Sequence, residues 1–268
     1  MSVEHSHSRI IAELAREGLA PIGFRRTGRS RTWIADQGWW ALYVVFEPSG
    51  FGRGTYLGVQ ASWLWDGGGQ GSRLRVAAAG LNRREGWSYE SDEQWTRIVR
   101  DLVPAAVARA QELREMFPNV DALSRVLDRG HRPSDAERAF AAELLATGDP
   151  RLLLQAQSHL SIGPNWRQRL DAAVAHGLLG RAEKAQWHLS RYLAADENRI
   201  RPDSHDWHRA RVDRARLLLD LVEDTAVFQE HILGEIARGR AELKLQPDWD
   251  RSDWLAVATE PSGDGSGR

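Results

Sequence analysis

The residues with the clearest capacity for chemistry are four arginines near the N-terminus, within seven residues that contain no acid. A planar guanidinium pairs bidentately with carboxylates or phosphates and stacks on aromatic rings. We therefore predict a site here for a phosphate, a nucleic acid or an acidic partner, completed by residues of the strands that follow. The predicted binding residues are Arg25, Arg26, Arg29, Arg31, Trp33, Tyr56, Arg73 and Arg75. The alternative is a solvated arginine hairpin beside aromatic residues of the core.

Metal chemistry has one candidate cluster in the sequence, at Asp203, His205, Asp206 and His208. Residues three apart share a helix face, but the HExxH spacing of zinc proteases is absent, and aspartate is common at a helix start as a cap. We therefore predict no metal site and no cofactor, while metal binding at His205 and His208 stays open as the alternative. His176 and His188 fall in a helical hairpin, and we interpret them as packing residues.

Other catalytic signatures are absent from the sequence. The glycine-rich run at residues 67–71 lacks the lysine and hydroxyl of a phosphate-binding loop, and no GxSxG motif occurs. Without cysteine there is no thiol nucleophile and no disulfide. We expect a non-catalytic protein, and a cryptic enzyme with another constellation is an alternative. The net charge of −1 argues against a generic nucleic-acid binder.

The candidate arginines and aromatics fall in a tryptophan-rich segment that we predict to be an antiparallel sheet. Residues 39–46 are an unbroken apolar run, typical of a central strand. Residues 56–65 alternate, which places Val59 and Trp63 on an apolar face and the intervening polar residues on the other. A further strand is predicted over residues 73–78.

Helices are predicted on both sides of these strands. One covers residues 8–18, and a longer one begins at a capping box of Ser91 and Gln94, with a kink or break expected near Pro104. The order indicates an α+β domain, in which a three- or four-stranded antiparallel sheet is packed by two helices.

This region resembles a known bacterial family. A first helix leads into GFRR at residues 23–26, a tryptophan-bearing strand follows, and YLGV stands at residues 56–59. Together these features resemble the family named domain of unknown function 4304. The segment from MFPN at residues 116–119 to residue 127 is similar to the closing helices of that family. The resemblance covers roughly residues 8–128 and implies no activity and no catalytic residues.

The second half has a helical pattern throughout. Helices are predicted over residues 134–145 and 149–160, and helix pairs over 166–179 with 181–194, joined at Gly180, and over 204–222 with 225–245. Five residues match the spacing of one tetratricopeptide repeat, with no clear second copy: Ala173, Gly180, Ala185, Leu189 and Tyr192. We therefore predict three parts: an α+β domain at 1–128, a helical-hairpin domain at 134–245, and a tail at 246–268 whose C-terminal part is disordered.

These features favour a binding protein of the bacterial cytoplasm. The N-terminus lacks the apolar segment of a signal peptide, and no stretch approaches the roughly 20 apolar residues of a membrane span. We predict a protein partner and an immunity-, antitoxin- or adaptor-like role, by analogy of fold. The alternative is a nucleic-acid or nucleotide-binding accessory factor that uses the arginine and aromatic sheet face. If the arginine hairpin is not the contact surface, the helices around Trp187 and Trp207 are the next candidates.

Overall fold

The computed structural model divides into two compact units, one of Met1–Pro118 with Leu233–Arg251 and one of Asn119–Ile232 with Ser252–Arg268. These bounds differ from the predicted domains at 1–128 and 134–245, because residues after 118 pack with later helices and the chain returns to the first unit after residue 232. The predicted helices within 134–160 lie outside the described residues. The described residues are 4–28, 31–48, 54–66, 73–76, 87–129, 166–196 and 206–256.

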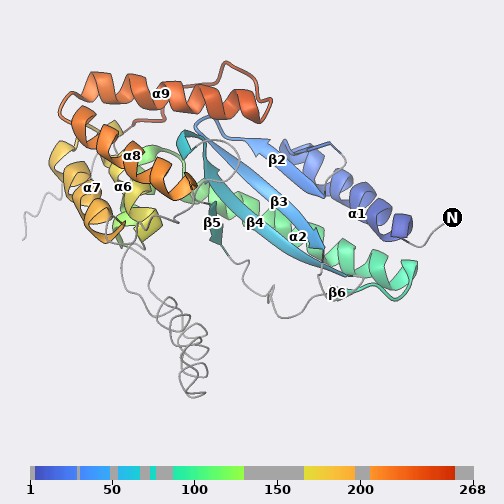
Figure 1. Ribbon diagram of the computed structural model, residues 1–268. Helices are drawn as coiled ribbons and strands as arrows, with labels where there is room; N and C mark the ends of the chain where they lie inside the picture. Colours follow the sequence, from blue (N-terminus) through green and yellow to red (C-terminus); the bar gives the residue numbers. More distant parts are fainter. Residues whose placement is uncertain are drawn as a thin grey trace, which may run out of the picture. The chain divides into compact units, whose positions relative to one another are not determined.

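The predicted α+β architecture is confirmed, and the sheet is antiparallel (Figure 1). Its strands run in the order β1 (Arg25–Arg26), β2 (Thr32–Asp36), β3 (Trp40–Pro48), β4 (Gly54–Trp63) and β5 (Arg73–Val76), and the short β6 (Trp87–Ser88) pairs with β4. Two helices run alongside the sheet in Figure 1, α1 (Glu4–Leu19) and α2 (Asp92–Met116). They pack against each other, and α2 packs against β4.

The strand register separates an apolar face from a more polar one. Trp33, Val44 and Val59 are aligned across β2, β3 and β4, and all three are buried. Trp63 lies opposite Trp40 on the same face and is buried too, which confirms the predicted phase of β4. The buried tryptophans make this face the core of the unit.

An aromatic cluster forms that core. The Trp39 ring stacks on the Trp65 ring with centroids 5.4 Å apart, and on the Trp63 ring at 5.5 Å. Phe117, at the C-cap of α2, meets the Trp63 ring edge-on at 5.2 Å and the Trp40 ring at 5.7 Å. Such offset and edge-to-face contacts are the arrangements that aromatic rings prefer.

Helix α2 begins as predicted but is not broken. The Ser91 Oγ accepts a hydrogen bond from the Gln94 backbone N–H at 3.2 Å, which caps the helix. The helix then continues through Pro104 to Met116, so of the predicted kink or break the break is excluded and the kink stays a prediction. Pro104 is exposed, and there the carbonyl left without its intrahelical donor can bond to water. The close approach of α1 to α2 needs Gly18, because a Cβ there would lie 2.2 Å from the Val103 side chain of α2.

The end of α9 (Thr225–Glu242) belongs to the first unit and is held there by a buried arginine. Arg240 is 1% exposed and donates hydrogen bonds to both carboxylate oxygens of Asp36, at 2.8 and 2.6 Å. It also donates to the carbonyls of Gly38 and Gln246. Gly239 permits the contact with the carbonyl of Leu64, from which an added Cβ would be only 2.4 Å away.

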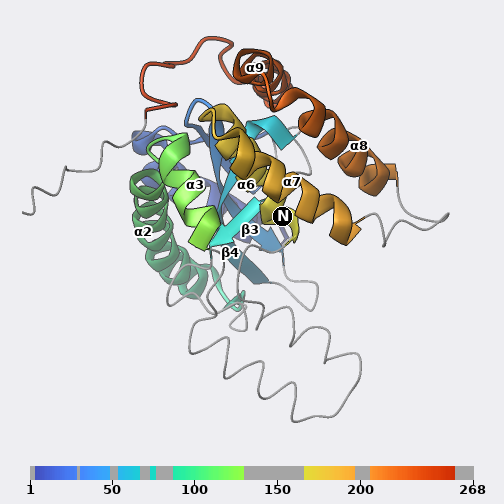
Figure 2. The same ribbon diagram turned by 90° about the vertical axis from the view of Figure 1, so that its left-hand side faces the viewer.

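The second unit is helical in its described parts (Figure 2). Its helix α3 (Val120–Arg129) packs against α6 (Trp166–Leu178), α6 against α7 (Ala182–Asp196), and α7 against α8 (Asp206–Leu221). The α6–α7 hairpin turns at Gly180, whose φ of 68° favours glycine, as the spacing predicted.

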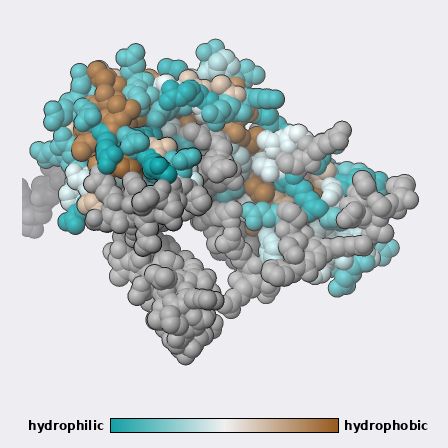
Figure 3. Space-filling model, in the orientation of Figure 1, coloured by the Kyte–Doolittle hydropathy of each residue, from teal (hydrophilic) through white to brown (hydrophobic). Residues whose placement is uncertain are grey.

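The residues at the repeat-like positions form the interior of that hairpin, since all four non-glycine members are buried: Ala173, Ala185, Leu189 and Tyr192. On the face drawn in Figure 3, apolar side chains gather over helices of the second unit. Across the described residues, no helix is both long and apolar enough to cross a membrane.

Candidate functional site

Two of the predicted arginines have bonding partners inside the first unit. Arg25 donates hydrogen bonds to the carbonyls of Leu243 and Lys244, at 2.6 and 3.1 Å, just past the end of α9. Arg31 donates to the Ser8 Oγ at 2.9 Å and contacts the His7 ring. Burial lowers the pKa of Arg31. Both guanidiniums therefore tie elements of the fold together.

The aromatic members of the predicted site are separated by the sheet. Trp33 is 2% exposed and lies on the apolar face, so it offers no stacking surface to a ligand. Tyr56 lies on the other face and is half-buried. That more polar face was a predicted contact surface, but its Gln60 and Ser62 are buried.

The remaining predicted arginines do not complete the site. Arg26 is half-buried and aligned with Trp33. Arg73 and Arg75 stand opposite Ser62 and Gln60 in β5, which places their register positions on the polar face, and Arg29 lies outside the described residues. The described members of the set thus do not converge on one exposed site.

A different group of residues converges in the second unit. The Asp128 Oδ1 of α3 lies 2.8 Å from the His176 Nε2 of α6 and 3.3 Å from the His188 Nε2 of α7. The two imidazole rings are stacked, with centroids 5.5 Å apart and planes at 12°. Both histidines are buried, whereas the Asp128 side chain is 34% exposed, so the cluster reaches solvent at its carboxylate. We call these three residues the Asp–His–His cluster.

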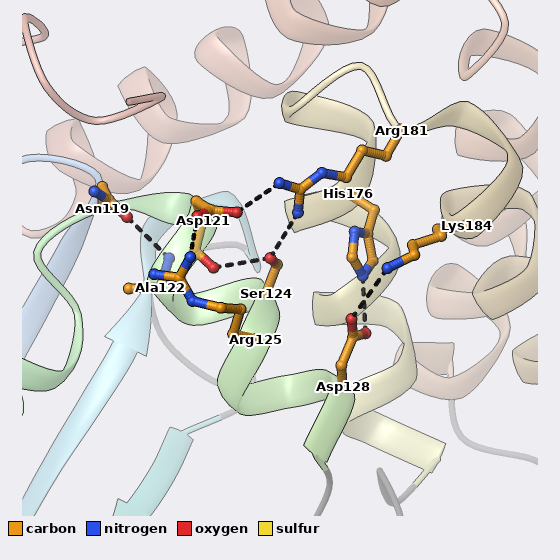
Figure 4. Close-up of polar contacts among 9 residues, drawn as sticks. All are labelled: Asn119, Asp121, Ala122, Ser124, Arg125, Asp128, His176, Arg181 and Lys184. Atoms are coloured by element: carbon orange, nitrogen blue, oxygen red, sulfur yellow. Dashed lines mark hydrogen bonds and ion pairs between the residues drawn. The ribbon is translucent and has the colours of Figure 1, made fainter. Parts of the chain in front are cut away.

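Polar contacts hold α3 against the hairpin that carries the histidines (Figure 4). Asn119 caps α3, since its Oδ1 accepts from the Ala122 N–H at 2.9 Å. In the first turn of α3, the Asp121 carboxylate pairs with Arg181 at 2.6 Å, and Arg181 also donates to the Ser124 Oγ. Asp121 is buried, and Arg181 immediately follows the Gly180 turn. This arrangement points Asp128 at His176, as Figure 4 shows.

The electrostatics of the cluster favour an ionised carboxylate beside two neutral imidazoles. Burial lowers the pKa of His176 and of His188, and outweighs the hydrogen bonds to Asp128 that raise them. Partial burial raises the pKa of Asp128, but the His176 and His188 hydrogen bonds and the charges of His176 and Lys184 bring it below its ordinary value. Among the described residues, neither histidine Nδ1 has a hydrogen-bond partner.

Sequence reasoning found only part of this cluster. Both histidines were predicted as packing residues and are buried, and their placement on the two helices of a hairpin could have suggested that they face each other. Asp128 lies 48 residues before His176, so no local spacing connects them. Of the cluster that sequence reasoning did single out, Asp203 and His205 lie outside the described residues, and His208 is half-buried on α8.

An exposed tryptophan lies beside the Asp–His–His cluster. Trp187 of α7 is 50% exposed, and its ring meets the His188 ring edge-on at 4.8 Å. The guanidinium carbons of Arg169 and Arg191 lie 5.5 and 5.7 Å from the Trp187 ring centroid, within the range of cation–π contacts. We call Arg169, Trp187 and Arg191 the Trp187 patch.

The arginines of the Trp187 patch lack acidic partners. In the part of the chain that the structure describes, neither forms an ion pair, and the Nη1 of Arg169 is buried without a hydrogen-bond acceptor. Burial, and then the nearby charge of Arg191, lower the pKa of Arg169. Two like charges therefore flank an exposed aromatic ring.

No family model, no curated protein and no solved structure matches the chain. The resemblance to domain of unknown function 4304 therefore stays a prediction from the residues quoted above, and the function has to be inferred from the geometry of the described residues.

Proposed function

We propose that the chain is a non-catalytic macromolecular binding protein of the bacterial cytoplasm, and that it docks an acidic segment of a partner protein on the Trp187 patch. The observation that supports this proposal is a half-exposed tryptophan flanked by two arginines without an acidic partner among the described residues. An immunity-, antitoxin- or adaptor-like role fits such a surface by analogy of fold.

The chemistry of the patch favours an acidic partner. Tryptophan and arginine are the residues most often found as interface hot spots, where a large ring is buried and a guanidinium is desolvated with it. The like charges of Arg169 and Arg191 repel each other, and a carboxylate bound between them would relieve that repulsion. A guanidinium binds a carboxylate through two parallel hydrogen bonds.

A protein partner is better supported than a nucleic acid. Binding of single-stranded nucleic acid needs exposed aromatic rings beside a basic groove. On the sheet, Trp33 is buried and Arg25 and Arg31 already bond to groups of the first unit. The net charge of −1 gives no general attraction to phosphate backbones either.

Capture experiments with the purified full-length chain as bait test the proposal in a bacterial lysate. Trp187→Ala and Arg191→Glu should each weaken capture of one acidic protein by about 30-fold, the effect of losing a hot spot of ~2 kcal/mol. Trp207→Ala is the matched control, because Trp207 is also 50% exposed and has Arg211 at 6.0 Å from its ring. That variant should capture the partner like the wild type.

Two results would count against this function. Equal capture by Trp187→Ala and the wild type would remove the patch from the contact surface. Capture that disappears after nuclease treatment, and that falls steeply with salt, would show a nucleic-acid partner in place of a protein.

A further inference from the structure

We propose that the Asp–His–His cluster is a binding site for one divalent transition-metal ion. Each of the three residues offers one ligand atom, and these atoms all lie within 4.8 Å of one another. The Nε2 atoms of His176 and His188 are the nitrogens that face the Asp128 Oδ1. The site departs from the expectation, based on sequence, that no metal is bound. It is independent of the proposed docking at the Trp187 patch, because a metal ion can be titrated without any partner.

The separations in the cluster suit ligands of a single ion. Zinc lies about 2.0–2.2 Å from nitrogen and oxygen ligands, so two ligands of one tetrahedral ion are roughly 3.3–3.6 Å apart, and slightly closer in octahedral geometry. The Asp128 Oδ1 is already 2.8 and 3.3 Å from the two Nε2 atoms. All three ligand atoms lie within 4.8 Å of one another, so binding of one ion would have to draw them together by at most about 1.5 Å.

A purely hydrogen-bonded cluster fits these distances less well. Both imidazoles would donate to the same Asp128 Oδ1, and the 3.3 Å contact from His188 is longer than the usual N–H···O range of about 2.7–3.2 Å. The second carboxylate oxygen, Oδ2, lies 3.7 Å from the Lys184 ammonium and receives no imidazole. A carboxylate oxygen can accept two hydrogen bonds, so the observation that leaves room for an ion is the length of the His188 contact, not the sharing of the oxygen.

The ligand set also determines the class of ion. Two imidazoles and a carboxylate suit Zn²⁺, Fe²⁺, Co²⁺ or Ni²⁺, whereas Mg²⁺ and Ca²⁺ prefer oxygen ligands. The three ligands come from three packed helices, α3, α6 and α7, which fix their positions. Three protein ligands leave at least one coordination position for water. An ion can reach the site past Asp128, whose side chain is 34% exposed.

The test uses the full-length chain after removal of metals with a chelator, and Zn²⁺ and Co²⁺ as probes. Calorimetric titration with Zn²⁺ should show one ion per chain, and Co²⁺ should give visible absorption bands. Asp128→Asn, His176→Gln and His188→Gln should each weaken Zn²⁺ binding by at least about 100-fold, because even second-shell changes cost about 10–100-fold. Circular dichroism should confirm that each variant is folded.

Two controls separate this site from others. His208→Gln should bind Zn²⁺ like the wild type, and so exclude a site at His205 and His208. Arg191→Met leaves the Trp187 ring packed on His188 and should also bind Zn²⁺ normally. Under the proposed function it weakens partner capture, so a failure of one proposal can be told from a failure of the other.

A surface variant keeps the test decisive if the histidine variants do not fold. The Lys184 ammonium is 62% exposed and competes with a cation for Asp128. Lys184→Gln should therefore strengthen Zn²⁺ binding by about 3–10-fold, because it removes the repulsion between the ammonium and the metal ion at a partly hydrated site. Lys184→Arg keeps the positive charge and should not strengthen binding. The proposal is overturned if the wild type binds no Zn²⁺ below about 100 µM, the ordinary range of weak surface sites, or if Asp128→Asn binds as tightly as the wild type.

Discussion

The two units use tryptophan and arginine in opposite ways. In the first unit, Trp63 is buried in an aromatic cluster, and Arg240 bonds to Asp36 and to backbone carbonyls of the same unit. In the second unit, Trp187 is half-exposed, and Arg191 lies on its ring without an ion pair among the described residues. Residue type alone therefore does not reveal a contact surface. A contact surface is indicated by an exposed apolar side chain, or by a charged side chain that has no partner in its own unit.

The largest contrast should come from truncating one tryptophan in each unit. Trp63→Ala should lower the free energy of unfolding by ~3–5 kcal/mol, because a large buried ring leaves a cavity. Trp187→Ala should cost less than about 1 kcal/mol, since a half-exposed side chain loses little burial. Urea titrations of both variants measure the difference. Equal losses of unfolding free energy would mean that Trp187 is a core residue and that the two units do not differ in their use of tryptophan.

Arginine offers the second pair of variants. Arg240→Met should destabilise the chain by about 3 kcal/mol, because it leaves the Asp36 carboxylate and several carbonyls without their buried donor. Arg191→Met removes only an exposed cation–π contact, worth ~0.5–1 kcal/mol. A thermal melt of each variant separates the two, and a larger loss at Arg191 would show that the Trp187 patch is structural.

Two glycines of α9 test how closely this helix packs in the first unit. Gly239→Ala should cost about 1–3 kcal/mol, since its Cβ would meet the Leu64 carbonyl and force the backbone apart. Gly234→Ala is the matched control, because its Cβ would meet only the Arg238 side chain at 3.8 Å. That change should be neutral or stabilise by ~0.5–1 kcal/mol through helix propensity. Similar denaturation midpoints for both variants would contradict the close contact.

The histidines make the stability of the chain depend on pH. The folded-state pKa values of His176 and His188 lie below the ordinary 6.5, so the unfolded state binds more protons as the pH falls below that value. The free energy of unfolding should be at its full value above about pH 7 and should decrease towards about pH 5. The decrease should be at most ~1.4 kcal/mol per pH unit for each histidine. The contribution of Asp128, whose pKa is lowered from 3.8, is lost only at still lower pH.

Denaturant titrations at several pH values, with a chelator present, measure this slope. His188→Gln should make it shallower, and His208→Gln should leave it unchanged. If His188→Gln leaves the slope unchanged, protonation of the buried His188 ring does not destabilise the folded state.

Local features of the fold could be predicted from the sequence, whereas contacts between distant segments could not. The alternation around Val59 and Trp63 determined which face of β4 is buried, and Gly180 located the turn of the α6–α7 hairpin. The contact of Arg240 with Asp36 joins residues 204 positions apart, so nothing in either segment indicated that the chain returns to the first unit.

The same contrast between local patterns and distant contacts applies to the residues of the predicted binding site. Arg25 and Arg31 matched a binding pattern by type and spacing, but their partners, Leu243 and Ser8, come from other elements of the fold. The position of Trp33 on the buried face depends on how β2 pairs with β3, and a single tryptophan shows no alternation from which to infer it. Trp187 was named as a secondary candidate, and its exposure became known only from the packing of its helix.

Photo-crosslinking tests most directly the claim that the Trp187 patch contacts a partner. A photoreactive phenylalanine analogue is placed at position 187 or, as the control, at position 207, and the chain is irradiated in a bacterial lysate. We expect a protein adduct from position 187 that is lost when Arg191→Glu is added, and no adduct of the same partner from position 207. An adduct from position 207 alone, or one at position 187 that Arg191→Glu does not change, would contradict the account.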